Sequence, residues 1–168
     1  MAHTGGDDRA SWTATPPAGL VQVLGFPLVL DRLYHSRTHM WVLPAGPDVA
    51  RIGMDRLGTE TSGTLAQLSF LAVGAELAAG RPFGQLEAAK FVGPLVSPVS
   101  GTMLAANQAV VADPGLAERD PYGDGWLIEV SLSDAAGELP ALLSAPDEII
   151  DWFVGKVEDY QLKGWIAQ

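Results

Sequence analysis

Cysteine is absent from the 168-residue sequence, and lysine is scarce in it. Without cysteine the chain forms neither disulfides nor thiolate ligands, which excludes a disulfide-stapled secreted scaffold. Lys90 is the only lysine before residue 156, and the other formal cations of that region are arginines. Because a guanidinium is not a practical target for acylation, a lone primary amine suggests covalent chemistry at Lys90. The alternative is a solvated lysine at a loop tip.

Positive charge and long apolar runs are also lacking. The formal net charge is −10, which speaks against binding to nucleic acid or to an anionic membrane and favours positively charged protein partners. The longest apolar stretch, residues 20–30, contains Gln22 and Pro27 and falls short of the roughly 20 residues of a spanning helix. The N-terminus carries Asp7 and Asp8 and has no signal-peptide or transit pattern. We therefore expect a cytoplasmic protein.

Glycine, proline and apolar residues dominate what is present. Nineteen glycines and twelve prolines favour a turn-rich β protein, and a hydrophobic content of 48% argues against disorder. A chain of this length suits one domain with appendages. We expect a flexible N-terminal extension over residues 1–25, a main domain over 26–136 and a C-terminal helical extension over 137–168.

Apolar segments between turn residues predict a series of strands. Residues 127–132 show the cleanest period of two, which indicates one buried face. A first strand or loop is expected at 26–33, a helical turn or loop at 54–62 and a short capped turn at 113–121. The other expected strands are 40–43, 49–52, 64–70, 83–87, 95–97 and 102–106.

The last part of the sequence predicts a helix that begins at Pro146. Its apolar residues recur with the 3.6-residue period of a helix packed on a core, at Ile149, Ile150, Phe153, Val154 and Val157. Acidic residues come early in this segment and Lys156 comes late, in agreement with the helix dipole. Residues 160–166 follow with several aromatics, which are expected to pack back on the domain; a contact with a partner is the alternative.

A near-repeat surrounds Lys90. Ser62-Gly63-Thr64-Leu65 precedes the lysine and Ser100-Gly101-Thr102-Met103 follows it. Such self-similarity is typical of one supersecondary unit used twice. We therefore expect Lys90 at the tip of the central hairpin of a pseudo-symmetric sheet structure.

Several motifs between residues 34 and 134 carry a resemblance to a known family. Residues 39–42 resemble a His-Glu-Trp-Val motif, residues 86–90 a Val-Glu-Ser-Val-Lys motif, residues 97–101 a Ser-Pro-Val-Ser-Gly motif and residues 120–128 an Asp-Pro-Tyr-Gly-Glu-Gly-Trp-Leu-Ile motif. In this order and spacing they resemble the lipoyl-carrying H protein of the glycine cleavage system.

This resemblance implies a mainly β fold, the barrel-sandwich hybrid of lipoyl domains with a C-terminal helix. It also implies a non-enzymatic carrier with lipoic acid in amide linkage to Lys90 and with Glu87 as part of the lipoylation motif. Phe91 either packs over the dithiolane or only caps the hairpin core. His39, which matches the family's histidine, is included among the cofactor-binding residues, although a histidine between apolar residues is more often a structural group.

Three departures from the family pattern bear on the cargo, the chemical group that the lipoyl arm would carry. Met40, Thr64 and Pro94 stand where H proteins supply acidic residues, which would weaken the binding of a cationic aminomethyl group. Moreover, residues 90–94 resemble the H-protein-like lipoate-binding proteins of sulfur oxidation. We therefore favour a sulfur or thiol pathway, with a true glycine cleavage H protein and an unlipoylated interaction module as alternatives.

The expected partners follow from these alternatives. They are a lipoate ligase or lipoyltransferase, dihydrolipoamide dehydrogenase, and either a heterodisulfide-reductase-like complex or glycine decarboxylase with aminomethyltransferase. No metal site is expected, because His3 and His35 lack ligand spacing. Residues 120–125 offer too few oxygens for calcium and are interpreted as a turn.

Overall fold

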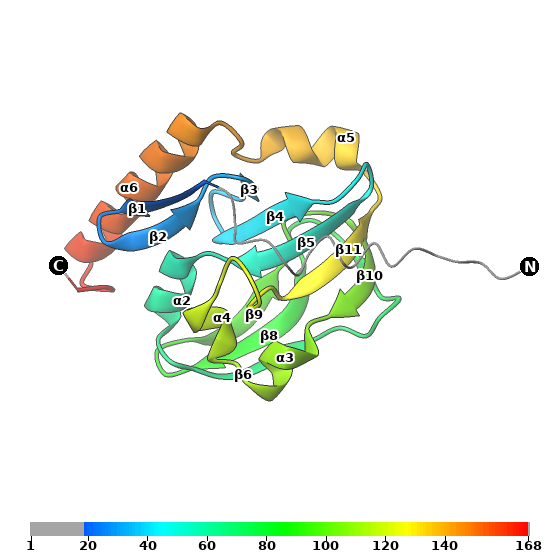
Figure 1. Cartoon of the computed structure of the whole chain (residues 1–168). Coiled ribbons are helices and arrows are strands. Elements are labelled where there is room, and N and C mark those ends of the chain that lie inside the picture. The colour runs from blue at the N-terminus through cyan, green and yellow to red at the C-terminus, as the bar shows by residue number, and fades with distance from the viewer. Residues whose placement is uncertain (1–18, 168) are drawn as a thin grey trace, which may run out of the picture.

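The computed structural model describes residues 19–167, so that residues 1–18, most of the expected N-terminal extension and His3 with it, lie outside the described residues. Strands dominate the described part (Figure 1). They are β1 (Leu20–Val23), β2 (Phe26–Val29), β3 (Leu33–Tyr34), β4 (Met40–Pro44), β5 (Val49–Met54), β6 (Leu65–Phe70), β7 (Glu76–Leu77), β8 (Pro82–Ala88), β9 (Val92–Val96), β10 (Gly101–Ala106) and β11 (Ile128–Leu132).

The helices are short except for the last. They are α2 (Arg56–Ser62), α3 (Gln108–Ala112), α4 (Leu116–Arg119), α5 (Ala135–Glu138), the 3₁₀ turn η1 (Leu139–Ala141) and α6 (Pro146–Leu162). Side-chain oxygens of Asp55, Asn107 and Asp134 cap α2, α3 and α5. No helix within residues 19–167 is both long enough and apolar enough to span a membrane.

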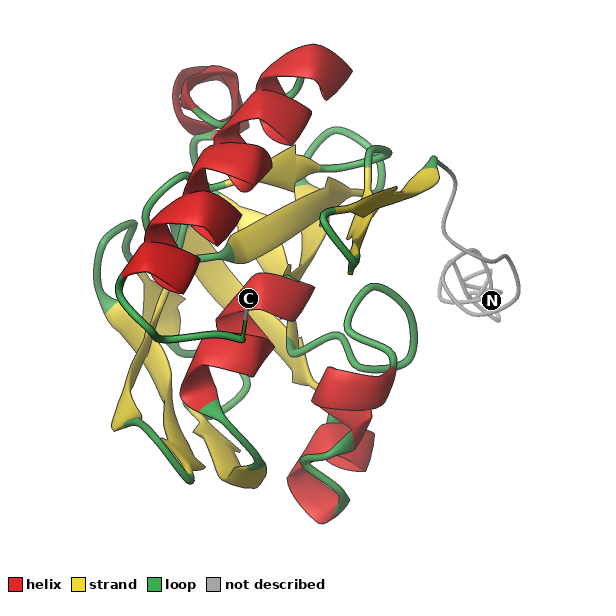
Figure 2. Cartoon of the chain, turned by 90° about the vertical axis from the view of Figure 1, so that its left-hand side faces the viewer, coloured by secondary structure: helices red, strands yellow, loops and turns green. Residues whose placement is uncertain are grey.

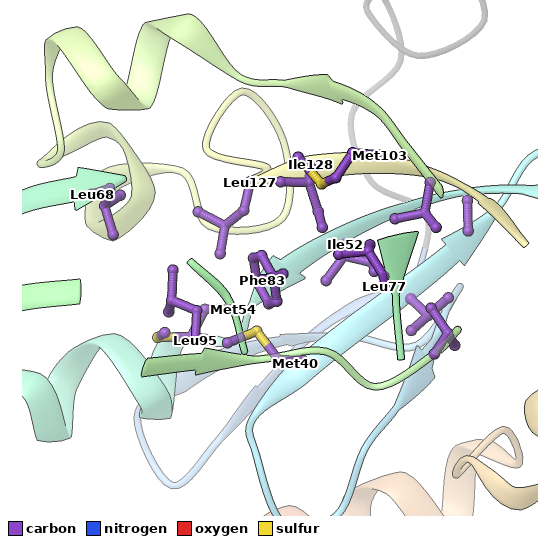
Figure 3. Packing of buried hydrophobic residues seen from close by; sticks show 14 of the residues in the cluster. Met40, Ile52, Met54, Leu68, Leu77, Phe83, Leu95, Met103, Leu127 and Ile128 are labelled. Carbon is purple, nitrogen blue, oxygen red and sulfur yellow. The ribbon is translucent and has the colours of Figure 1, made fainter. Parts of the chain in front are cut away.

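Two antiparallel sheets face each other around the main core. One has the strand order β3-β4-β5-β11-β10-β7 and the other the order β6-β8-β9. Figure 3 shows buried side chains of both sheets, Met40 and Ile52 from one and Phe83 and Leu95 from the other, packed in the space between them. The sheets do not close into a complete barrel, and the predicted barrel-sandwich hybrid with a C-terminal helix is confirmed.

A second apolar cluster lies beneath α6. Figure 2, which views the molecule from the side that carries this helix, shows α6 lying across the strands behind it. Its buried residues Ile149, Phe153 and Val157 pack with Tyr34 and Trp41 in this cluster. The helix therefore uses the stripe that the sequence predicted, and its stabilisation comes from this burial.

The N-terminal boundary differs from the expected one at residue 26. Strands β1 and β2 form an antiparallel hairpin in which Val23 pairs with Phe26. Val23 is buried in the cluster beneath α6. Residues 19–25 therefore belong to the folded unit, because the hairpin gains its apolar contacts from a helix more than a hundred residues away in the sequence.

The expected tail, residues 160–166, begins inside α6 and packs on the domain, as expected. Tyr160, on the last turn of the helix, and Ile166, beyond the helix, are both buried in the cluster beneath α6. Trp165 remains half-exposed, with its ring centroid 5.1 Å from that of Tyr160. The aromatic tail is thus part of the fold, with one side chain left at the surface.

Two glycines make a matched test of this packing. A Cβ at Gly53 would lie 2.2 Å from Cζ2 of Trp41, and the Trp41 ring is held in place because its Nε1 donates to the carbonyl of Pro121. We expect Gly53→Ala to lower the free energy of unfolding by about 2 kcal/mol through overpacking. A Cβ at Gly155, on the exposed side of α6, would meet nothing within 4 Å.

Gly155→Ala is accordingly expected to raise the free energy of unfolding by about 0.5–1 kcal/mol, the usual difference between the two residues inside a helix. Urea denaturation followed by tryptophan fluorescence measures both changes. A Gly53→Ala variant as stable as the parent would contradict the close contact with Trp41.

Candidate functional site

Lys90 lies at the tip of the β8–β9 hairpin. The backbone N–H of Ala88 donates to the carbonyl of Phe91 at 2.8 Å, which closes a turn with Ala89 and Lys90 as its two central residues. The strand register continues below this turn with Glu87 opposite Val92. The predicted position of Lys90 at a hairpin tip is confirmed, and both its side chain and that of Glu87 are exposed.

The tip rests on the junction between α2 and β6. The N–H of Lys90 donates to the carbonyl of Ser62, and the N–H of Ala89 donates to the carbonyl of Thr64, both at 3.0 Å. Gly63 between them has φ +79°, and a Cβ there would lie 3.1 Å from Cγ of Lys90. The Ser-Gly-Thr segment before the lysine thus supplies a close-fitting seat, which fixes the backbone from which the lysine side chain extends.

Phe91 sits beside the lysine and folds back along its own strand. A Cβ at Gly93 would lie 2.6 Å from Cζ of Phe91, so the ring covers a position where only glycine leaves room. The ring is 47% exposed, and it also lines the cavity described next. Phe91 therefore both caps the hairpin and faces the space next to Lys90.

A cavity of about 720 Å³ opens next to Lys90. The β8–β9 hairpin, α2, the segment that leads into β4 and the tail after α6 form its walls. Carboxylates are missing from these walls, where the formally charged side chains are Lys90 and Arg37. A mostly apolar cavity with a few polar groups is the usual form of a small-molecule site.

His39 forms part of the cavity wall, but each of its ring nitrogens already has a polar partner. Its Nδ1 lies 2.9 Å from Oδ2 of Asp55, and its Nε2 lies 2.7 Å from the hydroxyl of Tyr160. Burial, followed by the nearby Asp55 carboxylate, raises the pKa of Tyr160, so the phenol keeps its proton. A neutral His39 that donates from Nδ1 then accepts at Nε2 from this hydroxyl. Both ring nitrogens of His39 thus have partners within the fold, while its ring lines the cavity.

Asp55 joins His39 to the hairpin seat. Its carboxylate is fully buried, and Oδ1 accepts from the N–H of Gly58 as the cap of α2. The role of Asp55 was not predicted from the sequence, although an aspartate between a strand and a following helical segment is a usual N-cap residue. Tyr160 was foreseen only as part of the tail, yet it continues the apolar stripe of α6 beyond Val157.

Arg37, Thr38 and Trp165 were not recognised as cavity residues. They lie in a loop and in a tail, where no periodicity marks the face that a side chain occupies. Within residues 19–167 no group of three or more His, Asp or Glu side chains is arranged to hold a metal ion.

A family model of the glycine cleavage H-protein matches residues 33–149. The chain belongs to this family. The match includes both sheets' central strands, the α2 seat and the Lys90 hairpin, and it ends within α6. Since H proteins are carrier subunits, the expectation that the protein is not an enzyme is confirmed.

Individual relatives agree with this assignment. The chain is 40% identical over 119 residues to the glycine cleavage system H protein of Mycobacterium avium, which covers 71% of this chain and 87% of that protein. It is 40% identical over 112 residues to the one of Clavibacter sepedonicus, which covers 67% and 87%. The crystal structure of a glycine cleavage system H protein from Mycobacterium marinum superposes with a TM-score of 0.63 at 34% identity, and covers 71% of this chain and 94% of that one.

The contact between His39 and Tyr160 can be tested by a double-mutant cycle. Tyr160→Phe removes the hydroxyl and leaves a buried Nε2 without its partner, so we expect the free energy of unfolding to fall by about 1 kcal/mol. His39 has φ 59°, and asparagine tolerates that backbone conformation, so His39→Asn is a suitable second change.

In the His39→Asn background, Tyr160→Phe should cost at least about 0.5 kcal/mol less, because the partner is already gone. Urea unfolding of the four proteins gives the coupling energy. Equal costs in the two backgrounds would show that the Tyr160 hydroxyl stabilises the fold through another contact.

Proposed function

We propose that the chain is a lipoate carrier whose cofactor is joined by an amide bond to Nζ of Lys90. The observation that supports this most directly is the position of Lys90, on an exposed two-residue turn at the edge of a large cavity. An exposed turn can enter the active sites of other enzymes, while the adjacent cavity can receive the end of the arm between visits.

The surroundings of the turn suit modification by a lipoate ligase or lipoyltransferase. Ala88 and Ala89 add little bulk, and the exposed carboxylate of Glu87 lies three residues before the lysine. We assign Glu87 to recognition by the modifying enzyme and Phe91 to contact with the dithiolane. With no cysteine in the sequence, the arm cannot form a mixed disulfide with its own carrier. Dihydrolipoamide dehydrogenase would return the reduced arm to the disulfide.

The side chains of the cavity walls bear on the cargo, that is, on the chemical group that the arm would carry. Met40 and Pro94, which replace acidic residues of the family pattern, both line the cavity. Thr64, the third replacement, lies at the seat of the hairpin tip. A cationic aminomethyl group would find no carboxylate in these walls. This absence favours a thiol or sulfur cargo, delivered to a heterodisulfide-reductase-like complex.

Glycine cleavage is the second candidate function. It is favoured by membership of the H-protein family and by the names of the relatives. In that system the partners would be glycine decarboxylase and aminomethyltransferase, together with dihydrolipoamide dehydrogenase. An unlipoylated interaction module, the third alternative, leaves the exposed lysine, its glycine seat and the neighbouring Glu87 without a role.

The attachment site can be tested by lipoylation in vitro. We expect lipoate ligase to modify Lys90 and to leave Lys156 and Lys163 unmodified, which peptide mapping by mass spectrometry measures. Lys90→Arg should abolish the modification while it changes the free energy of unfolding by less than about 0.5 kcal/mol, as is usual for an exposed site. The matched control is Lys156→Arg with Lys163→Arg, which should be modified like the parent. An adduct on either C-terminal lysine would refute the assignment.

The choice of pathway can be tested with glycine decarboxylase. The lipoylated protein should accept the aminomethyl group at least about tenfold more slowly than the lipoylated Mycobacterium avium H protein, because each missing carboxylate removes on the order of 1 kcal/mol of attraction. Pro94→Asp should recover part of the rate, since Pro94 is an exposed wall residue. Loading as fast as that of the control protein would favour the glycine cleavage function instead.

A further inference from the structure

We infer that the cavity beside Lys90 selects an arm whose terminal sulfur carries an anionic group, and that Arg37 recognises that group. The inference rests on the proposed attachment of lipoate to Lys90 and deepens it, because it names the chemical class of the cargo. It follows from the charges, the unused hydrogen-bond donors and the C-terminal wall of the cavity.

The charge in the cavity is opposite in sign to that of the chain. The protein has a formal net charge of −10, yet the formally charged side chains in the cavity walls are Lys90 and Arg37. Acylation turns the Lys90 amine into a neutral amide, which leaves the guanidinium of Arg37. The buried carboxylate of Asp55, which contacts His39 of the cavity wall, already accepts from His39 and from the N–H of Gly58. A cation at the end of the arm would therefore meet repulsion without compensation.

One charged group in the wall has no partner within residues 19–167. Arg37 is exposed; its backbone N–H donates to Nδ1 of His35, and no hydrogen bond or ion pair is found for its guanidinium. An oxyanion accepts hydrogen bonds from a guanidinium in a paired geometry.

The segment after α6 forms another wall of the cavity and lies beyond the region that the family model matches. Gly164 has φ +72°. Its N–H donates to the carbonyl of Gln161, and the N–H of Trp165 donates to the carbonyl of Tyr160 at 2.9 Å. This is the Schellman arrangement that ends a helix and reverses the chain. The reversal places Trp165 in the cavity wall next to Tyr160.

The apolar wall strengthens an ionic contact inside the cavity. A guanidinium and an oxyanion attract each other more strongly where aromatic side chains exclude water, because the effective dielectric constant is lower there. Trp165 and Phe91 both line the cavity and are each about half-exposed, so they would shield part of such a contact. Arg37 would then distinguish an anionic arm from a cationic or neutral one.

An S-sulfonate is one cargo of this class, and a carboxylate-bearing thioether is another. Sulfite forms the first without a further oxidant. Its sulfur attacks one sulfur of the closed dithiolane, a new S–S bond forms, the ring S–S bond breaks, and the second sulfur leaves as a thiolate. Sulfite is oxidised in this step and the disulfide is reduced, so the electrons balance.

The cysteine-free chain permits a direct test, because the two thiols of a reduced lipoyl arm are then the only thiols present. The full-length lipoylated protein is reduced and alkylated with iodoacetate, iodoacetamide or 2-bromoethylamine, which gives anionic, neutral and cationic arms of similar size. A fourth sample is opened with sulfite. Each protein carries 5-fluorotryptophan, and the ¹⁹F signal of Trp165, assigned with Trp165→Phe, reports the docked fraction of the arm.

We expect the carboxymethyl arm to dock at least tenfold more favourably than the aminoethyl arm. Arg37→Gln should remove most of this preference. Arg81→Gln, which removes an exposed arginine outside the cavity, should leave it unchanged. Tighter docking of the sulfite-opened arm than of the carboxymethyl arm identifies a sulfonate cargo, and the reverse order identifies a carboxylate.

Two outcomes separate this inference from the proposed function. Intact mass and peptide mapping of every sample report first whether the arm is on Lys90; absence of the adduct there overturns the lipoate carrier and this inference with it. A protein lipoylated on Lys90 whose anionic and cationic arms dock equally, or whose preference survives Arg37→Gln, overturns the anionic cargo alone.

Discussion

The buried carboxylate of Asp55 holds together the three parts of the structure that form the site. One oxygen caps α2 through the N–H of Gly58, and the other binds Nδ1 of His39, whose Nε2 meets the hydroxyl of Tyr160 on α6. The opposite end of α2 carries the Ser62 carbonyl that receives the N–H of Lys90. The seat of the lysine and the wall of the cavity are therefore parts of one hydrogen-bonded unit, and a change at Asp55 would disturb both.

This rigidity suits a carrier. A swinging cofactor needs motion in its own chain of single bonds, whereas the backbone at its root has to present the same face to each enzyme that it visits. The hairpin tip meets this requirement through two backbone hydrogen bonds to the α2–β6 junction and through the close fit at Gly63. Since the lysine is separated from every other lysine by more than sixty residues of sequence, an enzyme that binds this region would meet a single primary amine.

The sequence predicted local features well and distant contacts poorly. The observed ends of β4, β6 and β10 lie within one residue of the predicted ends, because alternation and flanking glycines are local signals. The apolar stripe of α6 and the turn at Lys90 were likewise predicted from local signals. The β1–β2 hairpin was missed because its burial depends on α6, and the partner of His39 lies 121 residues away on Tyr160. No period in the sequence encodes such a pairing.

The cavity combines residues from inside the region of the family match with residues that follow it. The family match covers residues 33–149, whereas Tyr160, Gly164 and Trp165, which close one side of the cavity, come after it. Within the matched region lies the hairpin that carries Lys90, and Met40 and Pro94 place apolar side chains in the walls. Together these walls leave Lys90 and Arg37 as the formally charged side chains of the cavity, and no carboxylate of the described residues lines it.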